Sequence, residues 1–461
     1  MYQFLFNERG RMMKKLLLGS TALVVGGLMA APAMAADPIR IGVGGYYQFY
    51  ITAGQIEGAY ALNGSSLQLK GLSFFQEGEI HFIGSSKLDN GTTVGLTVEL
   101  EAWNPGLNVA AIGGSARTID EAFLFAFGDW GRVEFGARDQ ASYRMYFGVP
   151  SASLYSPAFQ HNAGVNFVNP IVGTNNLTAG GVTFLTIGGQ MQDVNRINYF
   201  TPRFMGLQLG VGYAPKINLA NSGPGVGSVC GANDAMATTV CPTNDYSWQD
   251  FFDIGANYLN KFGDVSVAAY GAFMYASFIP GFQTTAANLA ANSVTGSNLA
   301  SWKQWVAGLQ LGWNGFTLGG SYSYDNLGLG SNYYTGVDND NRKFGVGLMY
   351  ETGPWQMSAE WRGVYNNNGN GSGSLTAVAS GTSAGTVGGA TGTTAAFGTN
   401  QNAGALAFGG LSTNMYQVAA NYTLGPGIRV NGGANYYNIA GPSNAVSSQS
   451  WSVFLGMDLR F

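Results

Sequence analysis

Most of this sequence alternates between apolar and polar residues with a period of two. Between residues 93 and 101, valine and leucine take every second position, and Thr97 and Glu99 lie between them. The same alternation runs through Trp355–Arg362 and through Trp451–Phe461. Successive side chains of a strand point to opposite faces, so this period predicts β-strands with one apolar and one polar face.

Charged residues are too scarce for an ordinary soluble β-protein. They make up 10% of the sequence, against about 25% in typical soluble domains. After the N-terminal leader, no segment reaches the roughly 18 consecutive apolar residues of a membrane-spanning helix. A soluble β-sandwich also alternates, but it would carry more charge on its exposed faces. A transmembrane β-barrel accounts for both observations, because one face of each strand meets lipid and the other meets water.

The first 35 residues have the layout of a secretory signal. Two lysines precede an uncharged apolar stretch, and an Ala-Met-Ala sequence then offers the small residues that a signal peptidase recognises. A membrane-anchoring helix is the alternative, but the stretch is short and interrupted by glycines. We predict cleavage between Ala35 and Ala36, with a signal peptide at 1–35 and an exported chain at 36–461. The residues before Met12 or Met13 have the character of an over-extended gene start.

The alternation divides the exported chain into sixteen expected strands. They cover residues 39–53, 70–86, 91–103, 117–128, 131–140, 193–203, 206–216, 248–259, 264–276, 303–313, 315–325, 342–351, 355–365, 413–424, 427–439 and 449–461. An even number allows an antiparallel sheet to close on itself without an edge, and a sixteen-stranded barrel has room for a water-filled lumen. The expected fold is an all-β, transmembrane antiparallel β-barrel.

Short and long connections alternate along the chain. Some turns contain only two or three residues, such as 314–315, whereas long segments rich in Gly, Ser, Asn and Thr occupy 141–192, 217–246 and 277–301. This asymmetry is typical of a barrel with short periplasmic turns and long extracellular loops. The low-complexity run 366–410 has too little apolar surface to order itself, so we expect a mobile external loop there.

The only two cysteines, Cys230 and Cys241, lie in one of these long segments. In an exported protein such a pair is usually a disulfide, here one that closes a loop tip. Zinc binding is the alternative, but the spacing fits no zinc pattern, and the two histidines, His81 and His161, are too few and too scattered to complete one. We therefore predict a disulfide and no metal site.

The phase of each strand assigns charged residues to the inner face. The expected lumen residues are Glu77, Glu79, His81, Glu99, Glu101, Asp120, Glu134, Arg138, Arg196, Asp253, Asp325, Lys343, Glu360, Arg362 and Arg429. Those expected near mid-height, where charge most affects permeation, are Glu79, Glu99, Asp120, Arg138, Arg196 and Arg362. The alternative for many of them is a solvated wall position with little influence on transport.

Aromatic residues near strand ends are expected on the outer face, at the depth of the lipid headgroups. They are Tyr46, Phe127, Trp130, Trp305, Trp313, Tyr322, Trp355 and Trp451. An aromatic track that binds sugars is the alternative, which the outward phase disfavours.

Several segments make the chain similar to the trimeric, sixteen-stranded general porins of Gram-negative bacteria, in particular those of alphaproteobacteria. They are the opening strand Ile41–Tyr50 (IGVGGYYQFY), the hairpin Gly128–Arg138 (GDWGRVEFGAR), Arg196–Pro215 (RINYFTPRFMGLQLGVGYAP) and the last strand, which ends in Phe461. The resemblance covers the exported chain in architecture.

The resemblance implies a homotrimer in the outer membrane, in contact with lipid and lipopolysaccharide. It implies that Phe461 is the terminal aromatic that the barrel assembly machinery recognises. It also implies that the loop after the fifth strand, 141–192, folds into the lumen and narrows it. This loop departs from the family pattern, since it contains no Asp or Glu, has Arg144 as its only firm charge, and is rich in Tyr and Phe. The constriction field and the selectivity therefore stay open.

The favoured function is a porin for passive diffusion of small hydrophilic solutes and ions. The alternatives are a channel selective for sugars or other nutrients and a barrel-anchored surface structural protein. Without residues 1–35, which contain four basic residues and one acidic residue, the totals of 21 and 25 fall to 17 and 24, a net charge of −7. We therefore expect mild cation preference and no binding of nucleic acid.

An enzyme is not expected. No Ser/His/acid spacing and no G-x-S-x-G motif occur in the sequence. Residues 338–341 (DNDN) faintly resemble a calcium loop but lack its glycine and its distal glutamate. We expect no catalytic residues and no cofactor.

Overall fold

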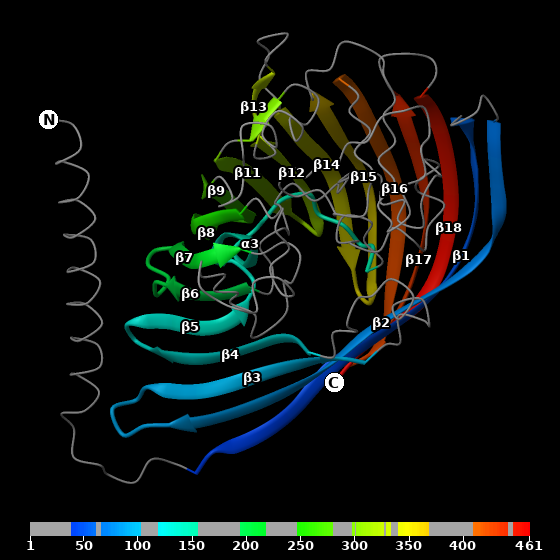
Figure 1. Ribbon diagram of the computed structural model, residues 1–461. Helices are drawn as coiled ribbons and strands as arrows, with labels where there is room; N and C mark the ends of the chain where they lie inside the picture. Colours follow the sequence, from blue (N-terminus) through cyan, green and yellow to red (C-terminus); the bar gives the residue numbers. More distant parts are fainter. Residues whose placement is uncertain are drawn as a thin grey trace, which may run out of the picture.

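The computed structural model describes residues 38–60, 66–102, 119–154, 194–217, 247–279, 297–299, 301–326, 329–332, 340–367, 409–440 and 446–461. Sixteen antiparallel strands form a closed barrel, in which each strand pairs with its neighbour along the chain and β1 pairs with β18 (Figure 1). Among the described residues, no helix has the length and apolar character needed to span a bilayer.

The barrel strands are β1 (Arg40–Tyr60), β2 (Ser66–Lys87), β3 (Thr93–Glu101), β4 (Ile119–Gly128), β5 (Gly131–Arg138), β6 (Val194–Phe200), β7 (Leu207–Ile217), β8 (Ser247–Phe262), β9 (Val265–Ile279), β11 (Trp302–Trp313), β12 (Phe316–Asp325), β14 (Asp340–Thr352), β15 (Trp355–Asn367), β16 (Gly409–Gly425), β17 (Ile428–Ala440) and β18 (Val446–Arg460). A separate two-stranded sheet joins β10 (Ser297–Leu299) to β13 (Leu329–Asn332).

Tight turns connect one end of successive strands. The turn between β11 and β12 contains only Asn314 and Gly315, both with positive φ, at 48° and 82°. A two-residue turn of this kind has a twist that matches the flanking strands, and Asn-Gly is its preferred sequence. It fixes the register that pairs Trp313 with Phe316.

The barrel has its apolar side chains outside and its polar side chains inside. In β18, Leu455 is 59% exposed on the outer face, whereas Asp458, on the opposite face, is fully buried. The same contrast separates Leu348 from Lys343 in β14. A soluble protein of this size would bury such leucines, so the outer belt is suited to a lipid environment.

The number of barrel strands and the fold class confirm the sequence-based prediction. The first two strands are longer than expected: β1 continues to Tyr60 and β2 begins at Ser66. The prediction ended both strands where the apolar alternation fades. Backbone pairing between the two strands continues past that point. Only the roughly 9–11 residues of a strand that cross the bilayer core need an apolar face, so a longer strand can pair beyond the core without apolar alternation. The β10–β13 sheet was not predicted.

Two outer-face predictions are wrong. Tyr46 pairs with Glu79 and therefore shares the inner face with it. Phe127 pairs with Arg132 and lies on the inner face as well. The other expected strand aromatics face outward; for example, Trp305, Trp355 and Trp451 are all nearly half exposed.

After β5, the chain turns into the barrel rather than directly to β6. A one-turn helix, α3 (Ala141–Arg144), is followed by an extended segment to Leu154. In Figure 1 this segment runs from α3 across the interior toward β15. Ala35, Ala36, Cys230, Cys241 and the remainder of 141–192 lie outside the described residues, as do residues 368–408 of the expected mobile loop.

Candidate functional site

One sector of the inner wall, formed by β2, β3 and β4, carries a concentration of carboxylates. The β2–β3 register pairs Glu79 with Glu101 and His81 with Glu99, so these four side chains share the inner face. Glu77 lies on the same face, since it pairs with Gln48 of β1 beside the Tyr46–Glu79 pair.

A bulge in β4 adds two more carboxylates. The β3–β4 register shifts after Val98, so that Asp120 and Glu121 both lie opposite the single residue Glu99. Glu121 is almost fully buried and forms an ion pair with Arg138 of β5. The acidic wall, as we use the name, consists of Glu77, Glu79, Glu99, Glu101, Asp120 and Glu121.

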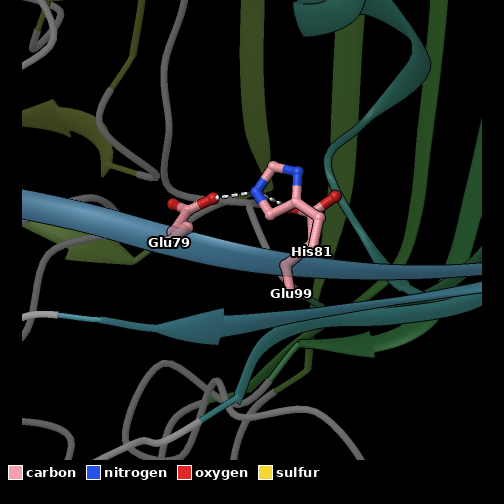
Figure 2. A group of neighbouring side chains, drawn as sticks. All are labelled: Glu79, His81 and Glu99. Carbon is pink, nitrogen blue, oxygen red and sulfur yellow. Dashed lines mark hydrogen bonds and ion pairs between the residues drawn. The ribbon is translucent and has the colours of Figure 1, made fainter. Parts of the chain in front are cut away.

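At the centre of this wall, His81 lies between two glutamates (Figure 2). Its Nε2 atom is 2.7 Å from Oε2 of Glu79 and 4.0 Å from Oε2 of Glu99. The other oxygen of each glutamate has a different partner. Tyr46 donates its hydroxyl to Oε1 of Glu79 at 2.9 Å, and Arg138 reaches Oε1 of Glu99 at 3.4 Å.

The neighbouring sector contains arginines that are held by glutamate and by aromatic rings. Arg132 binds Oε1 of Glu134 at 2.6 Å, and Arg144 of α3 binds Oε2 of the same carboxylate. The Arg132 guanidinium lies 4.7 Å from the ring centre of Phe125, and that of Arg144 lies 5.1 Å from Phe200. The two arginines therefore share one carboxylate, which offsets only one of their two positive charges, and the rings restrict where both arginines point.

Next to α3, a buried ion pair joins β6 to β8. Arg196 and Asp253 have fully buried side chains, with 3.8 Å between Nη1 and Oδ1. The other oxygen of Asp253 accepts the backbone N–H of Ser142 at 2.6 Å. Asp139, between β5 and α3, lies near Arg138, Arg144 and Arg196, yet burial raises its pKa to about 6.

The far wall also pairs its charges. Arg362 binds Glu360 at 2.6 Å within β15. Arg429 of β17 binds Asp458 of β18 at 2.8 Å, and Gln48 donates to the same carboxylate from β1. These pairs leave less net charge on the far wall than six carboxylates leave on the acidic wall.

Residues 145–154 contact inward-pointing side chains of several barrel strands, among them β12, β15, β16 and β17. Tyr146 donates its hydroxyl to Ser321 of β12 at 2.8 Å, and Ser151 donates to Glu360 of β15 at 2.6 Å. The carbonyl oxygen of Ala152 accepts hydrogen bonds from Asn421 and Asn431, which lie on β16 and β17. This segment therefore lies inside the barrel, against a large part of its wall.

The aromatic residues of this segment pack against the barrel. Tyr143, Tyr146 and Phe147 lie on a buried apolar cluster that includes Met274 and Trp302. Burial of each such side chain contributes about 1.5–3 kcal/mol, which helps to offset the entropy of ordering the segment.

The predicted mid-height residues, together with Arg144 of the predicted constriction loop, therefore form separate groups. Glu79, Glu99, Asp120 and Arg138 gather on or beside the acidic wall. Arg144 and Arg196 lie around α3, and Arg362 is on β15, paired with Glu360.

Sequence reasoning left several charged residues of the inner wall off its list, among them Glu121, Arg132, Asp139 and Asp458. Glu121 was missed because strict alternation places only one of two adjacent residues inside, and a bulge breaks that rule. Arg132 was missed because it lies close to the turn. Asp139 was missed because the expected strand 131–140 ran through it and alternation placed it outside, whereas β5 ends at Arg138. The proximity of His81 to Glu99 depends on the hairpin register: each lies six residues from the closing Lys87–Thr93 pair, which the predicted strands 70–86 and 91–103 did not identify.

A family model described as Gram-negative porin matches residues 19–277 and 261–458. A comparison with curated proteins found no match. Among solved structures, the outer membrane channel DcaP of Acinetobacter baumannii is 13% identical, with a TM-score of 0.50 over 92% of this chain and 97% of that one. The anion-selective porin of Comamonas acidovorans is also 13% identical, with a TM-score of 0.49 over 92% of this chain and 100% of that one.

Proposed function

The chain belongs to the Gram-negative porin family, and on that premise we propose that its barrel is a water-filled outer-membrane channel with a preference for cations. Small hydrophilic solutes and ions cross such a channel by passive diffusion. The outward apolar belt and the polar inner wall support this function, since together they suit a barrel that separates lipid from water.

The acidic wall is the observation that carries the cation preference. Its six carboxylates share their sector with one arginine, Arg138, which already pairs with Glu99 and Glu121. Arg196, Arg362 and Arg429 each have a carboxylate partner. Arg132 and Arg144 share Glu134, which leaves one positive charge in that sector against the larger negative surplus of the acidic wall. The surplus negative charge lies at the pore surface, where it concentrates cations and repels anions.

Reversal potentials in planar bilayers test this preference. A KCl gradient at low ionic strength is suitable, because screening is weakest there. The wild-type channel should favour K⁺, and the triple variant E77Q/E79Q/D120N should shift the reversal potential toward zero. The variant D89N/D129N/D264N removes three charges from exposed turns and should shift it much less. Anion preference in the wild type, or equal shifts in the two variants, would contradict the proposal.

We also propose that loop 141–192 constricts the lumen. The contacts of Tyr146 and Ala152 with the far wall support it, because they hold the start of the loop inside the barrel. Shortening the loop to a tight turn should raise single-channel conductance. Unchanged conductance with loss of the oligomer on a non-denaturing gel would instead assign the loop to a subunit interface.

We also propose the homotrimer that the family resemblance implies. Chemical cross-linking in outer-membrane vesicles should give a ladder that ends at the trimer. A sugar-selective channel is not favoured by the described part of the loop, where Tyr143, Tyr146 and Phe147 pack against the wall instead of presenting their faces to solutes.

A further inference from the structure

We propose that Glu79, His81 and Glu99 form a binding site for one divalent transition-metal ion in the wall of the pore. Zn²⁺ is the probe that the ligand set suggests. The inference goes beyond passive diffusion, and only its electrical test rests on the proposed channel function. The sequence predicted no metal site, because it offers only two histidines on distant segments.

The three side chains converge because of the hairpin geometry. Glu79 and His81 are two residues apart on β2 and point to the same face, while Glu99 lies directly opposite His81 on β3. Oε2 of Glu79, Oε2 of Glu99 and a ring nitrogen of His81 all lie within 4.8 Å of one another. Figure 2 shows both carboxylates beside the imidazole.

These separations are close to those of a bound ion. Zinc binds imidazole nitrogen and carboxylate oxygen at about 2.0–2.2 Å, which places neighbouring ligand atoms roughly 3 Å apart. The Nε2–Oε2 distance to Glu79 is 2.7 Å and that to Glu99 is 4.0 Å. Small side-chain rotations of the two glutamates therefore suffice, without movement of the strands.

Groups outside the site orient its ligands. The Tyr46 hydroxyl holds Oε1 of Glu79, and Arg138 approaches Oε1 of Glu99, so that each carboxylate turns Oε2 toward His81. The ring of Tyr46 also packs edge-on against His81, with 6.4 Å between the ring centres. Outer contacts of this kind fix metal ligands in place before an ion arrives.

The environment favours a cation and gives it access. Glu77 and Asp120 lie close to Glu79, so the site has more negative charge than Arg138 offsets. The side chains of His81, Glu79 and Glu99 are 26%, 13% and 12% exposed, which leaves a path from the lumen. Three protein ligands leave coordination positions for water.

The imidazole selects the class of ion. Ca²⁺ and Mg²⁺ bind oxygen ligands, and Ca²⁺ takes six to eight of them. Imidazole with carboxylate suits Zn²⁺ and its first-row neighbours. A site that relied on negative charge alone would not distinguish Zn²⁺ from Mg²⁺, and this difference provides the test.

Two measurements on the untagged full-length protein test the site. Isothermal titration of the detergent-solubilised protein should show one Zn²⁺ bound per chain, whether or not the protein conducts. Current through single channels should fall reversibly as Zn²⁺ is added at constant ionic strength, whereas Mg²⁺ at the same concentration should have little effect. Conductance before zinc is added tests the channel function separately.

The variant H81Q should raise both the dissociation constant and the half-blocking concentration about tenfold or more. H161Q, which removes the only other histidine in the sequence, is the matched control and should retain zinc binding. If H81Q does not assemble into a heat-modifiable barrel, E99Q serves in its place with the same expected loss. Equal zinc binding in H81Q or E99Q and the wild type, or equal effects of Zn²⁺ and Mg²⁺, would overturn the proposal.

Discussion

Removal of the Asp253 carboxylate should loosen the start of the constriction loop. Asp253 accepts the backbone N–H of Ser142 at 2.6 Å and lies 3.8 Å from Arg196. The variant D253A removes one partner of this buried ion pair, which costs about 3–5 kcal/mol. Ser142 of α3 lies directly against Asp253, so we expect detachment of α3 to let water reach Arg196, and this cost becomes a driving force for detachment.

Other contacts of α3 oppose that force. The Tyr270 hydroxyl donates to the carbonyl of Ser142 at 2.6 Å, and Asn257 donates to the carbonyl of Met145 at 3.0 Å. Two such hydrogen bonds contribute about 2 kcal/mol, and the buried side chain of Met145 contributes about 1.5–3 kcal/mol more. Packing of Tyr143 and the ion pair between Arg144 and Glu134 add further stabilisation, so the attached state should stay favoured in D253A while detachment becomes more frequent than in the wild type.

Single-channel recording resolves the two states. D253A should switch between the wild-type conductance and a higher level, and it should be cleaved faster by protease within residues 141–154. D253N separates the two effects: its amide oxygen can still accept the Ser142 N–H, but the charge opposite Arg196 is lost, so it should reach the higher level too, less often than D253A. One stable, wild-type level in D253A together with unchanged proteolysis would refute the reasoning.

Three further outcomes are expected. Mass spectrometry of protein from outer membranes should find a mature chain that begins at Ala36, and an intact leader would contradict the predicted cleavage. Y146F removes the hydrogen bond to Ser321 and should lower the free energy of unfolding in lipid vesicles by about 1 kcal/mol, whereas an unchanged value would show that water replaces the bond. Because the pKa of Asp139 is raised to about 6 in the folded protein, the folded state binds more protons than the unfolded chain, and stability should fall as pH rises from about 4 to 6. D139N should flatten this part of the pH profile, and an equal slope in both proteins would contradict the assignment.

Strand positions were predictable wherever one face is clearly apolar. The outward leucines of β18 alternate with Ser452 and Asp458, so their phase is unambiguous in the sequence. In β4, by contrast, Phe123, Phe125 and Phe127 alternate with alanine and leucine, and both faces are apolar. The arginines and the glutamate of β5 decide which face is inside, and this requires the register between the strands.

Tyr46 shows a different limit of sequence patterns. A tyrosine has an apolar ring and a polar hydroxyl, so its residue type suits either face. Two adjacent glycines precede it, and the tyrosine beside it offers no contrast. Only the hydrogen bonds to Glu77 and Glu79 identify its face. The carboxylates themselves were predictable, but their partners were not.

The pairing of β1 with β18 determines when the barrel can form. Gln48 and Asp458, which bond across this seam, are about 410 residues apart in sequence, and the backbones of Gly45 and Phe461 exchange two hydrogen bonds there. Until the last strand has been synthesised, β1 and the growing end of the sheet are both unpaired edges, which are prone to aggregate. Loop closure over the whole chain also makes this a slow step. Because of this seam, the barrel can close only after synthesis of the last strand. A chain that lacks this strand cannot form the closed barrel.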